Sequence, residues 1–203
     1  MTSTYAINFL KNVRTIIKVY ISNANMKTKP IKNAFTLMEL LVVISVIALL
    51  MGILLPVLNK VRAAGYRIAC RSNLHSISCA FRMYLDTSDD VMPPASSMPS
   101  VELEDRPPIT EFILPYLSEP KIFKCPSDRG SDSYFEKETT SYEYASMLGD
   151  QCVSQSFLTE RLKLTESNIH IMFDYEPFHG KAGQPGAVNY LYADGHVGDL
   201  RGP

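Results

Sequence analysis

The chain has 203 residues and a formal net charge of −1, with 20 basic and 21 acidic side chains. This length suits one domain with an additional element better than two full domains. The balanced charge does not indicate the clustered basic face that nucleic-acid binding requires, so no nucleic-acid partner is expected.

Hydropathy is distributed unevenly along the chain, although its mean of −0.02 is close to zero. Residues 35–58 are almost all apolar, whereas the sequence after Asp86 has the composition of a soluble protein. We therefore predict a basic leader at 1–34, a transmembrane helix at 35–58, an amphipathic stalk helix at 59–86, and a globular head at 87–203.

The leader contains six basic residues and no acidic one. A basic flank favours the cytoplasmic side of a membrane, but the flank after the apolar segment is basic too, so charge alone fixes the orientation weakly. Because Met26 is followed by a compact basic stretch, we predict that translation starts there and that residues 1–25 are not made. The alternative is a genuine long leader.

Residues 35–55 form an apolar run of 21 residues with one formal charge. As a helix this run spans roughly 31 Å, enough for the hydrocarbon core of a bilayer. A buried core helix would show a polar stripe, and a secretory signal peptide would have a shorter apolar region followed by a small-x-small cleavage site. The pattern favours a retained membrane span.

Glu39 supplies that single charge, one turn into the predicted span. A carboxylate in hydrocarbon is costly unless it is paired or protonated. Either Glu39 lies close enough to the interface to stay hydrated, or it has a cationic partner. The span contains no Lys or Arg, so that partner would have to come from elsewhere.

Residues 32–41 read Lys-Asn-Ala-Phe-Thr-Leu-Met-Glu-Leu-Leu. This stretch resembles the N-terminal signature of type IV pilins and type II secretion pseudopilins, with Ala34 where most members have Gly. The resemblance implies that a prepilin peptidase cuts between Ala34 and Phe35 and methylates the amino group of Phe35. It also implies that Glu39 pairs with the amino-terminal nitrogen of a neighbouring subunit during assembly.

The resemblance further implies a structural subunit of a type II secretion-type pseudopilus, and not an enzyme. Its partners would be copies of itself, other pseudopilins, the prepilin peptidase/methyltransferase, the inner-membrane assembly platform and membrane lipid. It would be a single-pass protein of the inner (cytoplasmic) membrane with a cytoplasmic N-terminus and an extracytoplasmic head. The alternatives are a type IV pilus subunit, or a membrane-anchored binding domain that does not polymerise.

The stalk helix shows apolar residues at helical spacing, with basic residues mostly between them. They are Val57, Val61, Ala64, Ile68, Leu74, Ile77, Phe81 and Tyr84. We expect this stripe to pack against a sheet of the head, in preference to lying on a membrane surface. Pro56 stands inside the combined helical run, which predicts a kink or a break there.

The predicted fold class is α+β and pilin-like, with the long N-terminal helix packed on a small antiparallel sheet. Residues 86–120 are rich in proline and predict a long loop with a short helix at 109–117, either functional or merely wrapping the surface. Strands are expected at 122–128, 140–148 and 168–175, and a brief helix at 156–164.

The C-terminal segment 188–200 carries the clearest local signal, a hairpin whose two-residue turn is Asp194-Gly195. Together with Cys125-Pro-Ser-Asp and Cys70-x-x-Asn-Leu, it resembles a pilin-like family that ends in a His, a nine-residue spacer and Asp-Gly. Here the nearest upstream histidine is His179, and fourteen residues separate it from Asp194, so the spacing is expanded.

The four cysteines allow three pairings if the head is exported, with Cys125–Cys152 as the candidate disulfide and free, partly buried thiols as the alternative. No C-x-x-C pair is present, so no zinc site is predicted. No cofactor is expected, calcium in a head loop being the alternative. No catalytic or metal site is predicted from His179, Asp194, His196 and Asp199, because the turn explains Asp194, and His196 and Asp199 point to opposite faces of a strand.

Overall fold

The computed structural model of the chain describes residues 36–100 and 106–200. It divides into two compact units, Met1–Ile53 and Leu54–Pro203, which are described separately below. The predictions for the start at Met26 and for cleavage between Ala34 and Phe35 fall outside the described residues.

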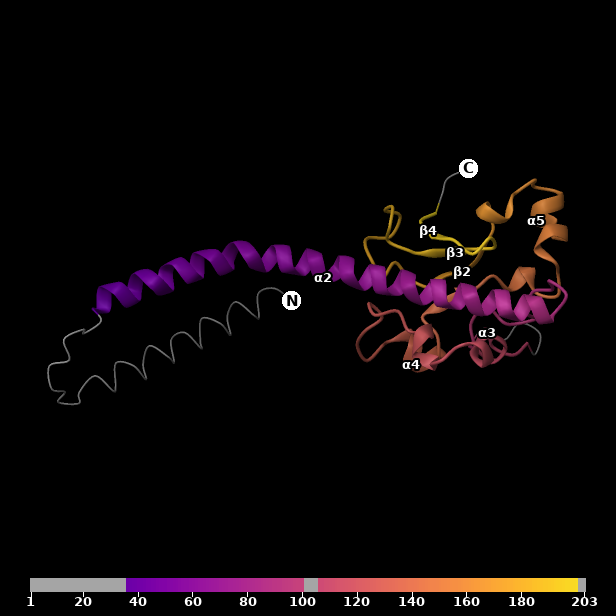
Figure 1. Cartoon of the computed structure of the whole chain (residues 1–203), viewed down its shortest axis with the longest axis horizontal. Coiled ribbons are helices and arrows are strands. Elements are labelled where there is room, and N and C mark those ends of the chain that lie inside the picture. Colours follow the sequence, from indigo (N-terminus) through magenta and orange to yellow (C-terminus); the bar gives the residue numbers. More distant parts are fainter. Residues whose placement is uncertain (1–35, 101–105, 201–203) are drawn as a thin grey trace. The chain divides into compact units, whose positions relative to one another are not determined.

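Helix α2 spans Leu37–Thr87 and contains Pro56 within its length (Figure 1). In the first unit its large apolar side chains from Leu37 to Ile53 are exposed, except for the half-buried Leu40. The helix is long and apolar enough to cross a membrane, as the sequence predicts. The kink at Pro56 stays a prediction.

In the second unit, α2 buries one face against the head, at positions three or four residues apart. These residues are Cys70, Leu74, Ile77, Ala80 and Phe81. The predicted stripe is therefore confirmed at its C-terminal end. It is wrong upstream, because Val57, Val61 and Ile68 are more than half exposed. Apolar side chains of α2 are fully buried against the head only from Cys70 onward.

The head contains a four-stranded antiparallel sheet in the order β1-β2-β3-β4, which confirms the α+β class. The strands are β1 (Tyr142–Tyr144), β2 (His170–Asp174), β3 (Tyr190–Tyr192) and β4 (Val197–Gly198). The register of β2 against β3 shifts between His170 and Met172. Such a bulge interrupts strict alternation, and both Ile171 and Met172 are buried.

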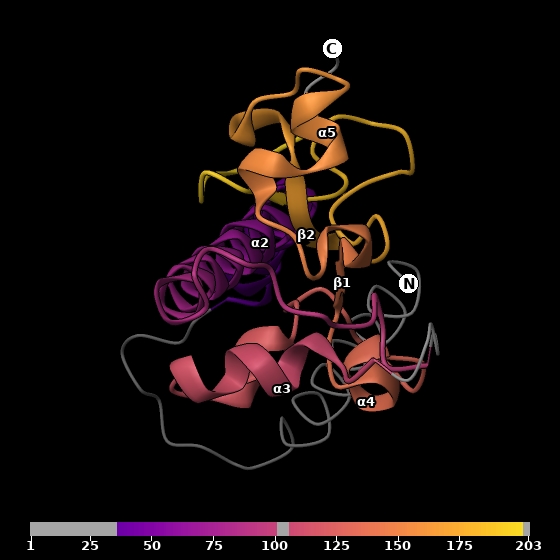
Figure 2. The same cartoon turned by 90° about the vertical axis from the view of Figure 1, so that its right-hand side faces the viewer.

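Short helices surround this sheet and the C-terminal half of α2. In Figure 1, α3 and α4 lie below that half of the helix, with β3, β4 and α5 above it; Figure 2 shows the same from the end, with β1 lower than β2. Their bounds are Ile109–Ile113 for α3, Tyr134–Glu138 for α4 and Phe157–Glu160 for α5. The short helices expected near 109–117 and 156–164 are thus confirmed.

The proline-rich segment after α2 contributes to the core. Met92, Ala95 and Met98 are almost completely buried, so the alternative of mere surface wrapping is wrong. The strand predicted at 122–128 is also wrong. A 3-10 turn, η3 (Pro120–Phe123), lies there instead, with a proline in its first turn and Phe123 buried at its end.

Asp194 and Gly195 lie in the turn between β3 and β4. The turn has three residues, not the two that the sequence predicts, because the Tyr192 amide donates to the His196 carbonyl at 3.0 Å across Ala193, Asp194 and Gly195. Gly195 has φ of +91°, the left-handed conformation that a three-residue hairpin loop requires.

Candidate functional site

Glu39 lies in the first turn of α2, where it forms a capping box with Thr36. Its Oε2 accepts hydrogen bonds from the Thr36 amide at 2.8 Å and from the Thr36 hydroxyl at 2.9 Å. The Thr36 hydroxyl in turn accepts from the Glu39 amide at 3.2 Å. Glu39 thus has a role within a single chain, in starting the helix, that sequence reasoning missed.

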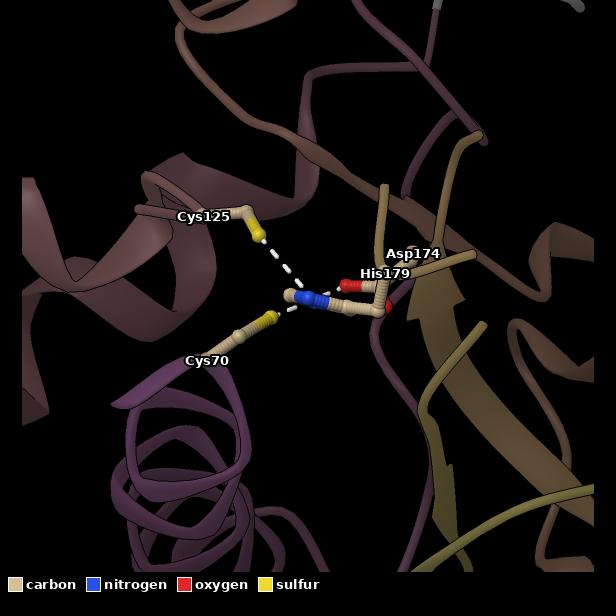
Figure 3. A group of neighbouring side chains, drawn as sticks. All are labelled: Cys70, Cys125, Asp174 and His179. Carbon is tan, nitrogen blue, oxygen red and sulfur yellow. Dashed lines mark hydrogen bonds and ion pairs between the residues drawn. The ribbon is translucent and has the colours of Figure 1, made fainter. Parts of the chain in front are cut away.

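Four side chains of the head form a second candidate site that the sequence did not reveal. Cys70, Cys125, Asp174 and His179 bring one potential metal-ligand atom each to within 4.8 Å of one another. We call these four residues the Cys-Asp-His cluster. Figure 3 shows the two sulfur atoms and the imidazole pointing toward a common centre.

Each member of the cluster comes from a different part of the second unit. Cys70 lies on the buried face of α2, Cys125 follows η3, Asp174 ends β2, and His179 lies in the loop that follows β2. The sheet, the helix and two loops therefore meet here. The cluster is enclosed, since Cys70 and Cys125 are fully buried and the side chains of His179 and Asp174 are 1% and 0% exposed.

Direct contacts connect the four groups. The Cys70 thiol donates to Asp174 Oδ1 at 3.0 Å, and the Cys125 sulfur lies 3.4 Å from His179 Nε2. His179 Nε2 is also 3.4 Å from Asp174 Oδ2. Polar groups at this depth are costly unless they are satisfied, and here each satisfies another.

A second ring of polar residues fixes the orientation of the cluster. The Asn189 amide and side chain donate to Asp174 Oδ2 at 2.7 and 2.9 Å. The Ser127 hydroxyl lies 3.4 Å from His179 Nδ1, which leaves Nε2 facing the cluster. The Tyr142 hydroxyl is 3.4 Å from the Cys70 sulfur.

The contacts within the cluster shift its acid–base properties. Hydrogen bonding with Cys125, reinforced by burial, raises the pKa of the Cys70 thiol. The same contact with Cys70 lowers the pKa of the Cys125 thiol, with burial opposing it and His179 adding to it. Burial raises the pKa of Asp174 to about 6, against the hydrogen bonds from Cys70 and Asn189. One thiol of the pair is thus poised to ionise before the other.

Asp128 anchors the loop that carries Cys125. Its carboxylate accepts from the Tyr134 and Phe135 amides at the start of α4 and from the Ser141 hydroxyl at 2.7 Å. The Ser141 hydroxyl accepts from the Cys125 amide at 3.0 Å. Asp128 therefore links α4, the start of the sheet and the Cys125 backbone.

Replacing Asp128 with Ala removes three hydrogen bonds to a buried carboxylate. We expect Asp128→Ala to lower the free energy of unfolding by about 2–4 kcal/mol, because buried donors lose their acceptor. Asp132→Ala, in the same loop, removes a side chain that is 90% exposed and should change stability by no more than about 0.5 kcal/mol. Urea unfolding of the full chain in detergent micelles, followed by near-ultraviolet circular dichroism, measures both. Equal losses in the two variants would contradict the anchoring role.

The structure does not bring His179, Asp194, His196 and Asp199 together in one site. His196 and Asp194 contact each other at 2.6 Å in the β3–β4 turn, and Asp199 pairs with Arg67 and Arg71. His179 instead belongs to the Cys-Asp-His cluster. No single site unites these residues.

The candidate disulfide is not formed, and all four cysteines are free. Cys125 lies beside His179, whereas the Cys152 sulfur lies 3.7 Å from the Asp89 carbonyl oxygen. Cys125 is buried in the loop after η3, whereas the backbone of Cys152 pairs with that of Val91, beyond the end of α2, in an isolated antiparallel β-bridge.

Residues 30–55 match the family described as the prokaryotic N-terminal methylation motif. No curated protein and no solved structure matches the chain. The matched segment includes the residues around the predicted cleavage point, Glu39, and most of the apolar half of α2. The chain is thus similar to proteins that carry this motif over residues 30–55, and its long helix α2 begins within the matched segment.

Proposed function

We propose that the chain is a structural subunit of a type II secretion-type pseudopilus, made as a prepilin and assembled through the apolar half of α2. The observation that carries this proposal is the methylation motif at residues 30–55, most of which lies in the first part of a helix able to span a membrane. A structural subunit needs no reaction centre, so we infer that the chain is not an enzyme.

Processing and assembly are linked by charge in this proposal. Cleavage between Ala34 and Phe35 exposes an amino group four residues before Glu39. In hydrocarbon an amine and a carboxylate each stabilise the other, so the amine of an incoming subunit can compensate Glu39 of its neighbour. Before cleavage the leader withholds this amine, so that only mature subunits form the pair.

The proposed location and partners follow from the same segment. The apolar half of α2 lies in the inner membrane, with the leader on the cytoplasmic side and the head on the other. The prepilin peptidase/methyltransferase acts on the leader, and the assembly platform then adds the subunit to copies of itself and other pseudopilins. The length of the polymer distinguishes a pseudopilus from a type IV pilus, which extends far beyond the cell.

Mass spectrometry of the protein from native membranes tests the processing step. The expected chain begins at Phe35 and carries one methyl group on its amino nitrogen. Ala34→Gly should be cut as well, because it restores the residue most common at this position, whereas Ala34→Leu should retain the leader. A mature protein that still begins at Met1 or Met26 would contradict the proposal.

A further inference from the structure

The Cys-Asp-His cluster has the donor atoms of a tetrahedral metal site. Two sulfurs, an imidazole nitrogen and a carboxylate oxygen are available, one from each residue. Calcium and magnesium take oxygen ligands, so the two sulfurs exclude both. Zinc accepts sulfur, nitrogen and oxygen ligands together in closed four-coordinate sites.

The distances between the donor atoms suit a zinc ion. With zinc–sulfur bonds of about 2.3 Å and bonds to nitrogen or oxygen of about 2.0–2.2 Å, tetrahedral ligands lie roughly 3.3–3.8 Å apart. The Cys125 sulfur and His179 Nε2 are separated by 3.4 Å, as are His179 Nε2 and Asp174 Oδ2. The Cys70 sulfur and Asp174 Oδ1 are closer, at 3.0 Å.

The surrounding hydrogen bonds are those that support metal ligands. Ser127 beside His179 Nδ1 leaves Nε2 free to bind the ion. Asn189 holds the Asp174 carboxylate through both its amide and its side chain, and it is itself fully buried. A histidine with a fixed ring and a carboxylate with a fixed plane form a preorganised site.

The charges that the four groups of the cluster can carry give a second, independent reason to expect a bound cation. Three of the four groups become anions when they ionise, yet among the described residues the ion-pair partner of Asp174 is His179, itself a cluster member. A divalent cation would balance this buried charge and connect α2, the sheet and two loops at one point. The sheet consists of strands of five residues or fewer, so such a tie would contribute substantially to the order of the head.

We propose that the head of this protein binds one structural zinc ion through Cys70, Cys125, Asp174 and His179. The proposal concerns the head alone and does not depend on cleavage of the leader or on polymer assembly. The ion is enclosed by four protein ligands, so it leaves no open position for a substrate.

Metal analysis of the full chain tests this proposal. The protein is purified in detergent under reducing conditions, with zinc chloride supplied and without a metal-affinity tag. We expect about one zinc ion per chain, and a loss of most of that zinc in Cys125→Ser and in His179→Ala. The matched controls, Cys79→Ser and Cys152→Ser, change cysteines outside the cluster and should retain the zinc of the unchanged protein.

Cobalt(II) substitution is measured on the unchanged protein, so the result does not depend on whether a variant folds. Cobalt bound to the unchanged chain should show the intense visible absorption of a tetrahedral thiolate site, and zinc should displace it. Ser127→Ala, which removes a supporting contact but no ligand, should weaken zinc binding about 10–100-fold.

Two results would overturn the proposal. One is a chain that, with its thiols reduced, contains no zinc and shows no cobalt spectrum. The other is an equal loss of zinc in Cys79→Ser and Cys125→Ser, which would show that the metal binds to thiols unspecifically.

Discussion

Replacing Glu39 with Gln or with Ala is expected to abolish assembly while leaving membrane insertion intact. Gln at this position can still complete the capping box with Thr36, since its side chain also accepts hydrogen bonds, but it carries no charge. If the carboxylate acts by balancing the amino terminus of another subunit, Gln fails as completely as Ala. Crosslinking of membranes, with detection of ladders of subunits, measures the effect.

The control for Glu39 is Thr36→Ala, which removes the hydroxyl of the capping box and keeps the charge. We expect this variant to assemble, although loss of the N-cap hydroxyl should reduce the stability of α2 by about 1 kcal/mol. Mass spectrometry verifies that every variant is cut before Phe35. Should Glu39→Gln assemble like the unchanged protein, Glu39 would serve only to begin the helix, and the proposed subunit pairing would lose its physical basis.

Truncating Phe81 to Ala is expected to destabilise the head by about 3–5 kcal/mol. Phe81 is 2% exposed on the inner face of α2, and its ring stacks on that of Tyr144 in β1 at a centroid distance of 6.1 Å. The substitution removes the ring and leaves a cavity between helix and sheet, where Leu74 and Ile77 complete the same face. Urea unfolding of the full chain in detergent micelles, followed by near-ultraviolet circular dichroism, measures the loss.

Met83→Ala is the matched control on the same helix. Met83 is 52% exposed, two residues from Phe81, and its truncation should change the free energy of unfolding by no more than about 0.5 kcal/mol. The contrast separates packing of α2 into the head from attachment of α2 to a membrane surface. A stable Phe81→Ala protein would favour the surface arrangement.

Local patterns predicted most elements of the head. The run around β2 is rich in β-branched and aromatic residues, and Asp-Gly marks the last turn, so both could be read directly. The strand prediction at 122–128 failed because a run as short as Ile122-Phe123 cannot distinguish a strand from a 3-10 turn, and the preceding Pro120 favours the turn. The predicted packing stripe of α2 begins too early, at Val57, because the spacing of apolar residues shows which face of a helix is apolar but not where along the helix the head covers that face.

The candidate sites differ in how much the sequence reveals. Glu39 is the one charged residue in an apolar segment, so the local sequence is enough to identify it. The Cys-Asp-His cluster depends on contacts such as Cys70 with Asp174, which are 104 residues apart. The sequence identifies His179 as the histidine upstream of the Asp194-Gly195 turn. Its neighbours in space depend on how the loops fold onto α2, and residue spacing does not predict that.

The contacts between α2 and the end of the chain set an order of events in biosynthesis. Ser78 donates to the Gly195 carbonyl at 3.1 Å, and Arg67 pairs with Asp199, across 117 and 132 residues. The ribosome makes α2 more than 100 residues before these partners, so the buried face of α2 around Leu74, Ile77 and Phe81 is incompletely covered until they have been synthesised. Closing such a long loop is slow, and exposed apolar surface invites aggregation. Folding of the head around α2 is therefore expected to finish only after β3 and β4 have been synthesised.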